Sequence, residues 1–157
     1  RIVYGGGNVG LMGLVADAAL EANGEVVGVI PRFLVDLEVA HRGLTELRVV
    51  ETMHDRKRVM AELADGFVVL SGGFGTLEEA IEVVTWRQLG LHSKPVVFLD
   101  VDGFWRPFVA LVEHLIAAGF AHPAHATLFA VAKSVEEALR AATSAAVATR
   151  SADLKWT

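Results

Sequence analysis

Short apolar runs alternate with longer amphipathic segments along the chain, and this alternation predicts an α/β fold. Most apolar runs contain almost no polar residue, as expected for parallel strands that are covered on both faces. We predict strands at 2–4, 26–30, 47–50, 66–70 and 96–99, with a weaker one at 129–132. Helices are predicted at 10–23, 52–64, 76–91, 104–118 and 135–148. This order predicts a Rossmann-like open parallel sheet flanked by helices, in three αβα layers.

The segment 31–46 is the least regular part of the chain. It carries mixed charge and Gly43, so we predict that it forms a lid or a substrate-binding loop. The length of 157 residues and the apolar content of 53% fit a single domain over 1–157. Because a first strand at residue 2 would run directly into three glycines, we expect a further strand and helix before it in the complete protein.

The composition of the chain excludes several classes of ligand and binding site. A net charge of -5 does not attract nucleic acid, so any phosphate must be bound by local groups. The chain has no cysteine and its six histidines lack ligand spacing, so we predict no metal site. We also expect no cofactor. No apolar run reaches the roughly 18 residues that span a bilayer, and no signal peptide is recognisable, so we expect a cytoplasmic protein that does not bind membranes.

Two glycine-rich loops each follow a predicted strand and precede a predicted helix. The first runs from Tyr4 to Gly13 and the second from Val69 to Glu79. Glycines let the backbone approach an anion, and a helix N-terminus offers N–H groups and partial positive charge. We therefore predict a shared anion site, with a tight turn between strand and helix as the alternative explanation of the first loop. The predicted contacts are Gly6, Gly7 and Met12 in the first loop, and Gly72, Gly73, Phe74, Gly75 and Thr76 in the second.

The second loop differs from two common phosphate-binding motifs. Thr76 stands where a Walker loop needs lysine, and the glycines lack the full G-x-G-x-x-G spacing of dinucleotide folds. A monophosphate suits this loop better than a triphosphate or a dinucleotide. Thr76 and Glu79 also have a purely structural explanation, because T-x-x-E is the pattern of a capping box at a helix start.

A basic segment begins the predicted helix at 52–64. Arg56, Lys57 and Arg58 place three positive charges in the first turn, where each opposes the helix dipole at a cost of about 0.3 to 1 kcal/mol. An anionic ligand would offset this cost, and a planar guanidinium at Arg56 is able to bind one through two N–H groups. The alternative is that Asp55 and solvent neutralise these charges.

Taken together, these segments resemble the signature of the "Lonely guy" phosphoribohydrolases. The resemblance is carried by Y-G-G-G-x-V-G-L-M-G at 4–13, M-H-x-R-K at 53–57 and G-G-x-G-T-x-x-E at 72–79. It continues in the strand at 26–31 and in V-T-W-x-Q-L-G at 84–90. It implies a homodimer or higher homo-oligomer that hydrolyses the N-glycosidic bond of N6-substituted adenosine 5′-monophosphates, or of AMP itself. The products are the free base and ribose 5-phosphate.

The resemblance also implies roles for individual residues. Arg56 and Glu79 correspond to the catalytic pair, and Ser71 stands where the family usually has proline, which we expect to loosen the turn. The corresponding ligand-binding positions are Glu38, Lys57, Gly73, Phe74, Gly75, Thr76 and Thr85. Relatives have been labelled lysine decarboxylases, but no lysine here has the setting of a pyridoxal Schiff base. A binding protein that carries a phosphorylated cofactor without turnover is the alternative function.

Overall fold

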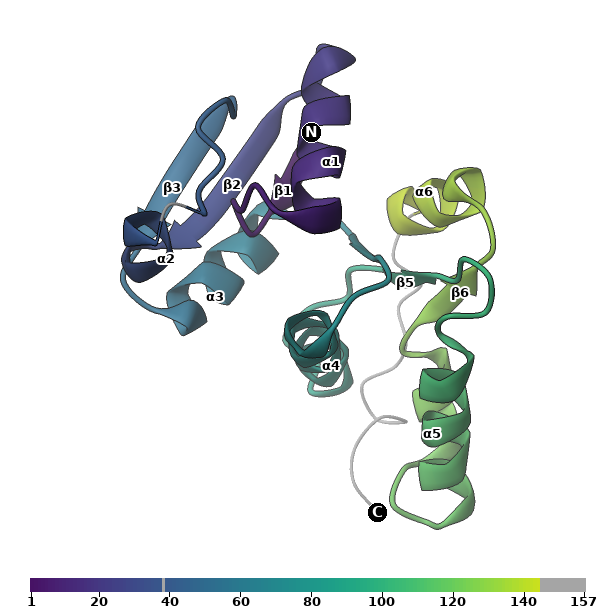
Figure 1. Ribbon diagram of the computed structural model, residues 1–157. Coiled ribbons are helices and arrows are strands. Elements are labelled where there is room, and N and C mark those ends of the chain that lie inside the picture. The colour runs from purple at the N-terminus through teal and green to yellow at the C-terminus, as the bar shows by residue number, and fades with distance from the viewer. Residues whose placement is uncertain (38, 145–157) are drawn as a thin grey trace. The chain divides into compact units, whose positions relative to one another are not determined.

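The computed structural model describes residues 1–37 and 39–144, and the chain divides into two compact units. The first unit is Arg1–Ala64 and the second is Asp65–Thr157. In each unit three parallel strands form a sheet that is flanked by helices (Figure 1). This arrangement confirms the predicted α/β class with a Rossmann-like layering of helix and sheet. The single domain over 1–157 stays a prediction.

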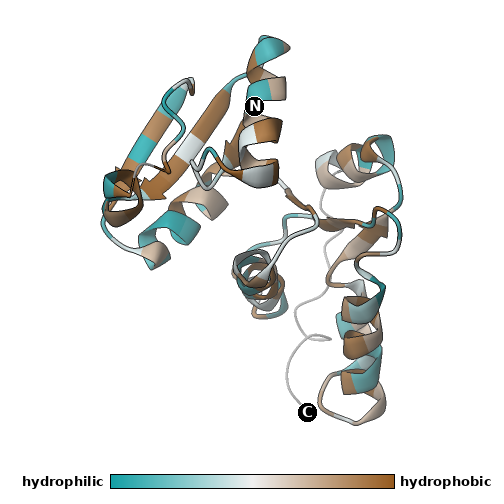
Figure 2. Cartoon of the chain, in the orientation of Figure 1, coloured by the Kyte–Doolittle hydropathy of each residue, from teal (hydrophilic) through white to brown (hydrophobic). Residues whose placement is uncertain are grey.

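The sheet of the first unit has the strand order β1-β2-β3, with β1 at Ile2–Tyr4, β2 at Val26–Pro31 and β3 at Glu46–Val50. Every residue of β2 is buried, and Figure 2 shows this strand as mostly hydrophobic. Since successive side chains of a strand point to opposite faces, β2 is covered on both faces. Helices α1 (Gly10–Glu21) and α3 (Met53–Leu63) both pack against it.

The sheet of the second unit has the strand order β4-β5-β6, and all pairs in it are parallel. Its strands are β4 at Phe67–Val69, β5 at Val96–Leu99 and β6 at Ala130–Ala132. The helices described in this unit are α4 (Phe74–Gln88), α5 (Arg106–Ala117), the short 3-10 helix η1 (Pro123–Thr127) and α6 (Val135–Thr143). The helix predicted at 135–148 lies partly outside the described residues.

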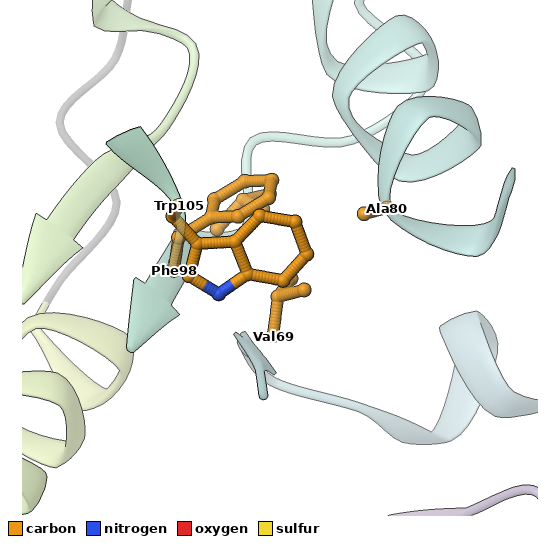
Figure 3. Packing of buried hydrophobic residues seen from close by; sticks show 5 residues of the cluster. Val69, Ala80, Phe98 and Trp105 are labelled. Carbon is orange, nitrogen blue, oxygen red and sulfur yellow. The ribbon is translucent and has the colours of Figure 1, made fainter. Parts of the chain in front are cut away.

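The central strand β5 has a separate apolar cluster on each face. Phe98 belongs to the cluster that includes Ala80 of α4 and Trp105, whereas Val97 and Leu99 belong to the cluster that α6 covers. The Phe98 ring meets the Trp105 indole edge-on, with ring centroids 4.9 Å apart (Figure 3). Full burial of such a side chain contributes about 1.5–3 kcal/mol, so these contacts hold β5 between its two layers.

One helix was not predicted, and two helices begin two residues away from their predicted starts. The short helix α2 (Arg32–Asp36) lies in the segment that was predicted to be irregular. Helix α4 begins at Phe74, two residues before the predicted start. Helix α5 begins at Arg106 rather than at 104, because residues 102–105 form a turn in which the N–H of Phe104 donates to the carbonyl of Val101 and the N–H of Trp105 donates to the Asp100 carboxylate.

Two structural absences apply to residues 1–37 and 39–144 only. None of the helices in these ranges is long and apolar enough to cross a membrane. The same ranges contain no group of three or more His, Cys, Asp or Glu side chains that could hold a metal ion.

Candidate functional site

The first glycine turn, residues 5–9, connects the carboxyl end of β1 to the start of α1. Gly5, Gly6 and Gly7 are buried, and Gly6 has a φ of 73°, in the left-handed region that favours glycine. Gly28 of β2 lies so close that a Cβ atom built on it would be 2.8 Å from the Cα of Gly6. The backbone of the turn is therefore packed directly on the central strand at the carboxyl edge of the sheet.

Helix α1 begins directly after this turn without a side-chain cap. Its N-cap residue, Val9, makes no capping hydrogen bond, and its first turn contains no acidic residue. A helix end of this kind attracts anions through its N–H groups and its dipole. Met12 reaches back to the turn, because its Cε would be 3.1 Å from a Cβ atom built on Gly7. The structure thus brings together the predicted contacts Gly6, Gly7 and Met12.

Arg56 approaches the same turn from α3. Its guanidinium lies so close to the backbone of Gly5 that a Cβ atom at this position would overlap with it. Nε of Arg56 donates to the carbonyl oxygen of Val29 in β2 over 3.2 Å, and Nη1 lies 3.9 Å from Sδ of Met53. The residue is only 8% exposed. Arg56 is therefore held beside the first glycine turn, where the carboxyl ends of β1 and β2 meet.

The consecutive cations of α3 have different environments. Thr52 Oγ1 accepts a hydrogen bond from the N–H of Asp55 over 3.0 Å and donates one to its carboxylate over 2.7 Å. The Thr52 hydroxyl and then Arg58 lower the pKa of Asp55, and Arg58 lies 3.4 Å from that carboxylate. Neutralisation by Asp55 is thus confirmed for Arg58. Lys57, in contrast, is 8% exposed and is therefore not a solvated surface charge.

The second glycine turn, residues 70–76, comprises the connection from β4 and the first three residues of α4 in the second unit. Gly73 is the N-cap of α4, where it makes no side-chain cap, and the first turn of the helix contains no acidic residue. The capping-box explanation of Thr76 and Glu79 is therefore wrong, because the helix has already begun two residues before Thr76. The side chain of Thr76 lies over Gly72, where a Cβ atom would overlap with its Oγ1.

The remaining glycines of the second turn leave open space. A Cβ atom built on Gly73 or Gly75 would have no neighbour within 4 Å, and neither glycine has a positive φ. The described fold therefore gives no steric or conformational reason for glycine at these two positions. Phe74, which lies between them, is 92% exposed. Exposed backbone at a helix N-terminus without a cap is suited to contact with an anion.

The other predicted residues are distributed over both units. Glu79 is half-buried on α4, and Thr85 is exposed on the same helix, where its hydroxyl donates to the carbonyl of Ile81 over 2.7 Å. Arg56 belongs to the first unit and Glu79 to the second, so their catalytic pairing stays a prediction. Glu38 lies outside the described residues.

Sequence reasoning missed a group of polar residues that supports the first glycine turn. His41 is 6% exposed, its ring nitrogen Nε2 lies 2.9 Å from Oδ1 of Asp17, and its backbone N–H donates to the carbonyl of Gly6. The hydroxyl of Tyr4 donates to the carbonyl of Gly7 over 3.1 Å. The signal in the sequence is weak, because His41 and Asp17 are 24 positions apart and no period connects them.

Comparison with known proteins determines the family. A family model described as "Possible lysine decarboxylase" matches residues 12–142. A protein from Rhodococcoides fascians named "Cytokinin riboside 5'-monophosphate phosphoribohydrolase" is 52% identical over 142 residues, which cover 90% of this chain and 72% of that protein. The chain belongs to this phosphoribohydrolase family. The family model spans both Arg56 and Glu79.

Plant members of the phosphoribohydrolase family are also similar to this chain. A protein of that name from Oryza sativa subsp. japonica is 50% identical over 119 residues, which cover 76% of this chain and 49% of the rice protein. Another, from Arabidopsis thaliana, is 44% identical over 137 residues, which cover 87% of this chain and 60% of that protein. The chain thus spans about half of the rice family member and 72% of the R. fascians one.

Proposed function

We propose that this chain hydrolyses the N-glycosidic bond of an adenosine 5′-monophosphate, with or without an N6 substituent, and releases the free base and ribose 5-phosphate. The observation that carries the proposal is the position of Arg56. Its buried guanidinium lies on the backbone of Gly5, at the carboxyl edge where ligands of open α/β sheets bind. The names of the R. fascians and plant relatives support the same activity.

The proposed chemistry assigns opposite charges to the two sides of the bond. Cleavage builds positive charge on the ribose and negative charge on the departing base. Glu79 stabilises the ribosyl cation, orients ribose hydroxyls or activates water. Arg56 stabilises the leaving base or the phosphate electrostatically, because a guanidinium with a pKa above about 12 is a poor proton donor at neutral pH.

In this scheme the phosphate is bound by the two glycine turns and by Lys57. Helices α1 and α4 both begin without a side-chain cap. The first turn of each helix also contains no acidic residue, so no carboxylate of that turn competes with a phosphate for the N–H groups. An uncapped helix end of this kind supplies N–H donors for a phosphate. Gly6, Gly7 and Met12 in one unit and Gly72 to Thr76, with Thr85, in the other are the proposed contacts.

We test the function by following base release from AMP, N6-isopentenyl AMP and the other nucleoside monophosphates by chromatography. Glu79→Gln is expected to lower the rate by about 10²- to 10⁴-fold, as for other acid–base or ion-stabilising groups, and Arg56→Ala is expected to have a comparable effect. Glu113→Gln, an exposed carboxylate of α5, is the matched control and should keep the full rate. Unchanged turnover in both site variants would contradict the assignment.

The same assay separates the enzyme from a carrier. A carrier of a phosphorylated cofactor would bind AMP in calorimetry and would release no base, whatever the substrate concentration. Base release that depends on Glu79 and Arg56 excludes that alternative, because retention of a phosphate alone does not need this pair.

We further propose that the protein is a cytoplasmic homodimer or higher homo-oligomer. The support for the oligomer is the apolar surface at α4, where Ile81 of the helix is 49% exposed and Leu89, its C-cap, is 54% exposed. Helices with such a surface commonly bury it against another copy. Light scattering of the purified protein is expected to give at least twice the chain mass of 16.8 kDa, and a monomer at micromolar concentration would contradict this part of the proposal.

A further inference from the structure

The backbone of residues 39–43, here called the clamp segment, is paired with the first glycine turn. The N–H of His41 donates to the carbonyl of Gly6 over 2.9 Å, and the N–H of Asn8 donates back to the segment over 2.8 Å. These bonds form an antiparallel bridge at Gly7. Because a trans peptide is planar, turning the carbonyl of Gly6 toward His41 makes the N–H of Gly7 point the opposite way. The clamp segment thus sets the direction of that amide.

The side chain of His41 anchors the clamp segment to α1. Its Nδ1 accepts a hydrogen bond from the N–H of Gly43 over 3.1 Å. Since a backbone N–H can only donate, the proton of the neutral ring is on Nε2, which donates to Oδ1 of Asp17 over 2.9 Å. Both ring nitrogens therefore have partners, and buried polar groups with complete partners hold a single arrangement.

Asp17 also interacts electrostatically with Tyr4, the last residue of the strand that leads into the turn. Burial and then the negative charge of Asp17 raise the pKa of Tyr4 to about 12, so its hydroxyl stays protonated and continues to donate to the carbonyl of Gly7. The carbonyls of Gly6 and Gly7 are thus each bound by a donor of this group. The next glycine toward β1 is Gly5, on which the guanidinium of Arg56 lies.

We propose that Asp17 and His41 are a positioning pair that holds the first glycine turn in its nucleotide-binding conformation and, through Gly5, holds Arg56. The pair acts through the backbone of Gly6 and does not itself contact the nucleotide. This inference rests on the proposed function, because it assigns the pair to nucleotide turnover. It adds two residues to the site that none of the sequence motifs includes.

Asp17→Ala is the variant that tests the pair. The Asp17 side chain is 56% exposed, and alanine is the best helix former, so α1 is expected to fold. Hydrogen–deuterium exchange at 5–9 and 39–43 is expected to rise by about three- to tenfold, as for the loss of one hydrogen bond. The KM for AMP should rise by a similar factor and kcat should change less than twofold, because bound nucleotide orders the turn again.

Two further variants distinguish positioning from general stability. Asp17→Asn keeps an acceptor for the Nε2 proton of His41 and is expected to restore most of the exchange protection and of the KM. Glu21→Ala removes another exposed carboxylate of α1 and should change neither quantity. Unchanged exchange in Asp17→Ala, or a loss of kcat that only follows the fraction of unfolded protein, would overturn the proposal.

The exchange measurement needs no substrate, so it separates this inference from the proposed function. Faster exchange in Asp17→Ala, together with a wild type that releases no base from any nucleotide, would contradict the proposed function and support the pair's hold on the turn. Normal base release in the wild type, together with unchanged exchange and KM in Asp17→Ala, would contradict the pair and support the function.

Discussion

The first glycine turn is enclosed by its own unit, whereas the second is open. Gly5, Gly6 and Gly7 are buried and the carbonyls of the latter two are bound by donors. Gly73 and Gly75 have open space where a side chain would be. In the first turn glycine is required because protein groups, above all Arg56, approach the backbone. In the second turn the Thr76 side chain covers Gly72, but no protein group approaches Gly73 or Gly75, and such open backbone is expected where a ligand binds.

The largest effect on stability and activity is expected from Gly5→Ala, which adds a methyl group to the enclosed turn. The added methyl group would take the place of the Arg56 guanidinium, so the arginine must move. We expect a loss of stability of about 1–3 kcal/mol and a decrease in kcat/KM of about 10²-fold, the usual result of displacing a catalytic group by about 1 Å. Denaturant unfolding and the base-release assay measure the two effects. Activity within threefold of wild type would show that the function of Arg56 does not depend on its contact with the backbone of Gly5.

A smaller effect is expected from Thr76→Val in the open turn. Valine keeps the shape that covers Gly72 and removes only the hydroxyl, so the free energy of unfolding should stay nearly constant. Loss of one hydrogen bond to a phosphate should reduce kcat/KM by about tenfold. Thr143→Val is the matched control, since that hydroxyl donates to the carbonyl of Leu139 within α6. Equal kinetics in the two variants would remove Thr76 from the site.

Gly75→Ala should change stability and affinity in opposite directions. The residue lies in the first turn of α4 with open space around it, so alanine is expected to stabilise the helix by up to about 0.5–1 kcal/mol. The same methyl group would stand at the proposed phosphate contact, so the KM for AMP should rise a few fold. A more stable protein with an unchanged KM would mean that the open turn does not contact the nucleotide.

The smallest and most local effect is the titration of Tyr4, the one tyrosine in the sequence. Its pKa is raised from 10.0 to about 12, so between pH 10 and 12 the folded state keeps a proton that the unfolded chain loses. Stability is therefore expected to decrease with rising pH across that window and to decrease less in Tyr4→Phe. Absorbance at alkaline pH follows the phenol directly. In Asp17→Ala its midpoint should decrease, because one of the two causes of the shift is removed.

The parts of the fold that the sequence predicted well are those with a purely local cause. Strand β5 lies at the predicted 96–99, because four apolar residues in a row are buried on both faces. Helix α2 was missed, since five residues are too few to display a helical period. The start of α4 was placed two residues late, because T-x-x-E imitates a cap while the true cap is the backbone of Gly73.

In the candidate site, too, the features with a local cause could be predicted and the contacts between distant segments could not. The glycine turns and Arg56 could be predicted because each lies within one short motif. The contact of Arg56 with Gly5 and the contact of His41 with Asp17 could not, because they depend on how α3 and the clamp segment return to β1 after the chain has crossed the sheet. Contacts of this kind are determined by the packing of distant segments, which a local sequence pattern does not predict.

The edge-on packing of Trp105 against Phe98 gives the second unit an optical label. All three tryptophans, at 86, 105 and 156, follow residue 65, whereas the one tyrosine precedes it. Indole emission during heating therefore follows the melting of Asp65–Thr157, and phenol absorbance follows that of Arg1–Ala64. Coincident midpoints would mark one cooperative domain, and separate midpoints would mean that the two halves of the chain melt independently.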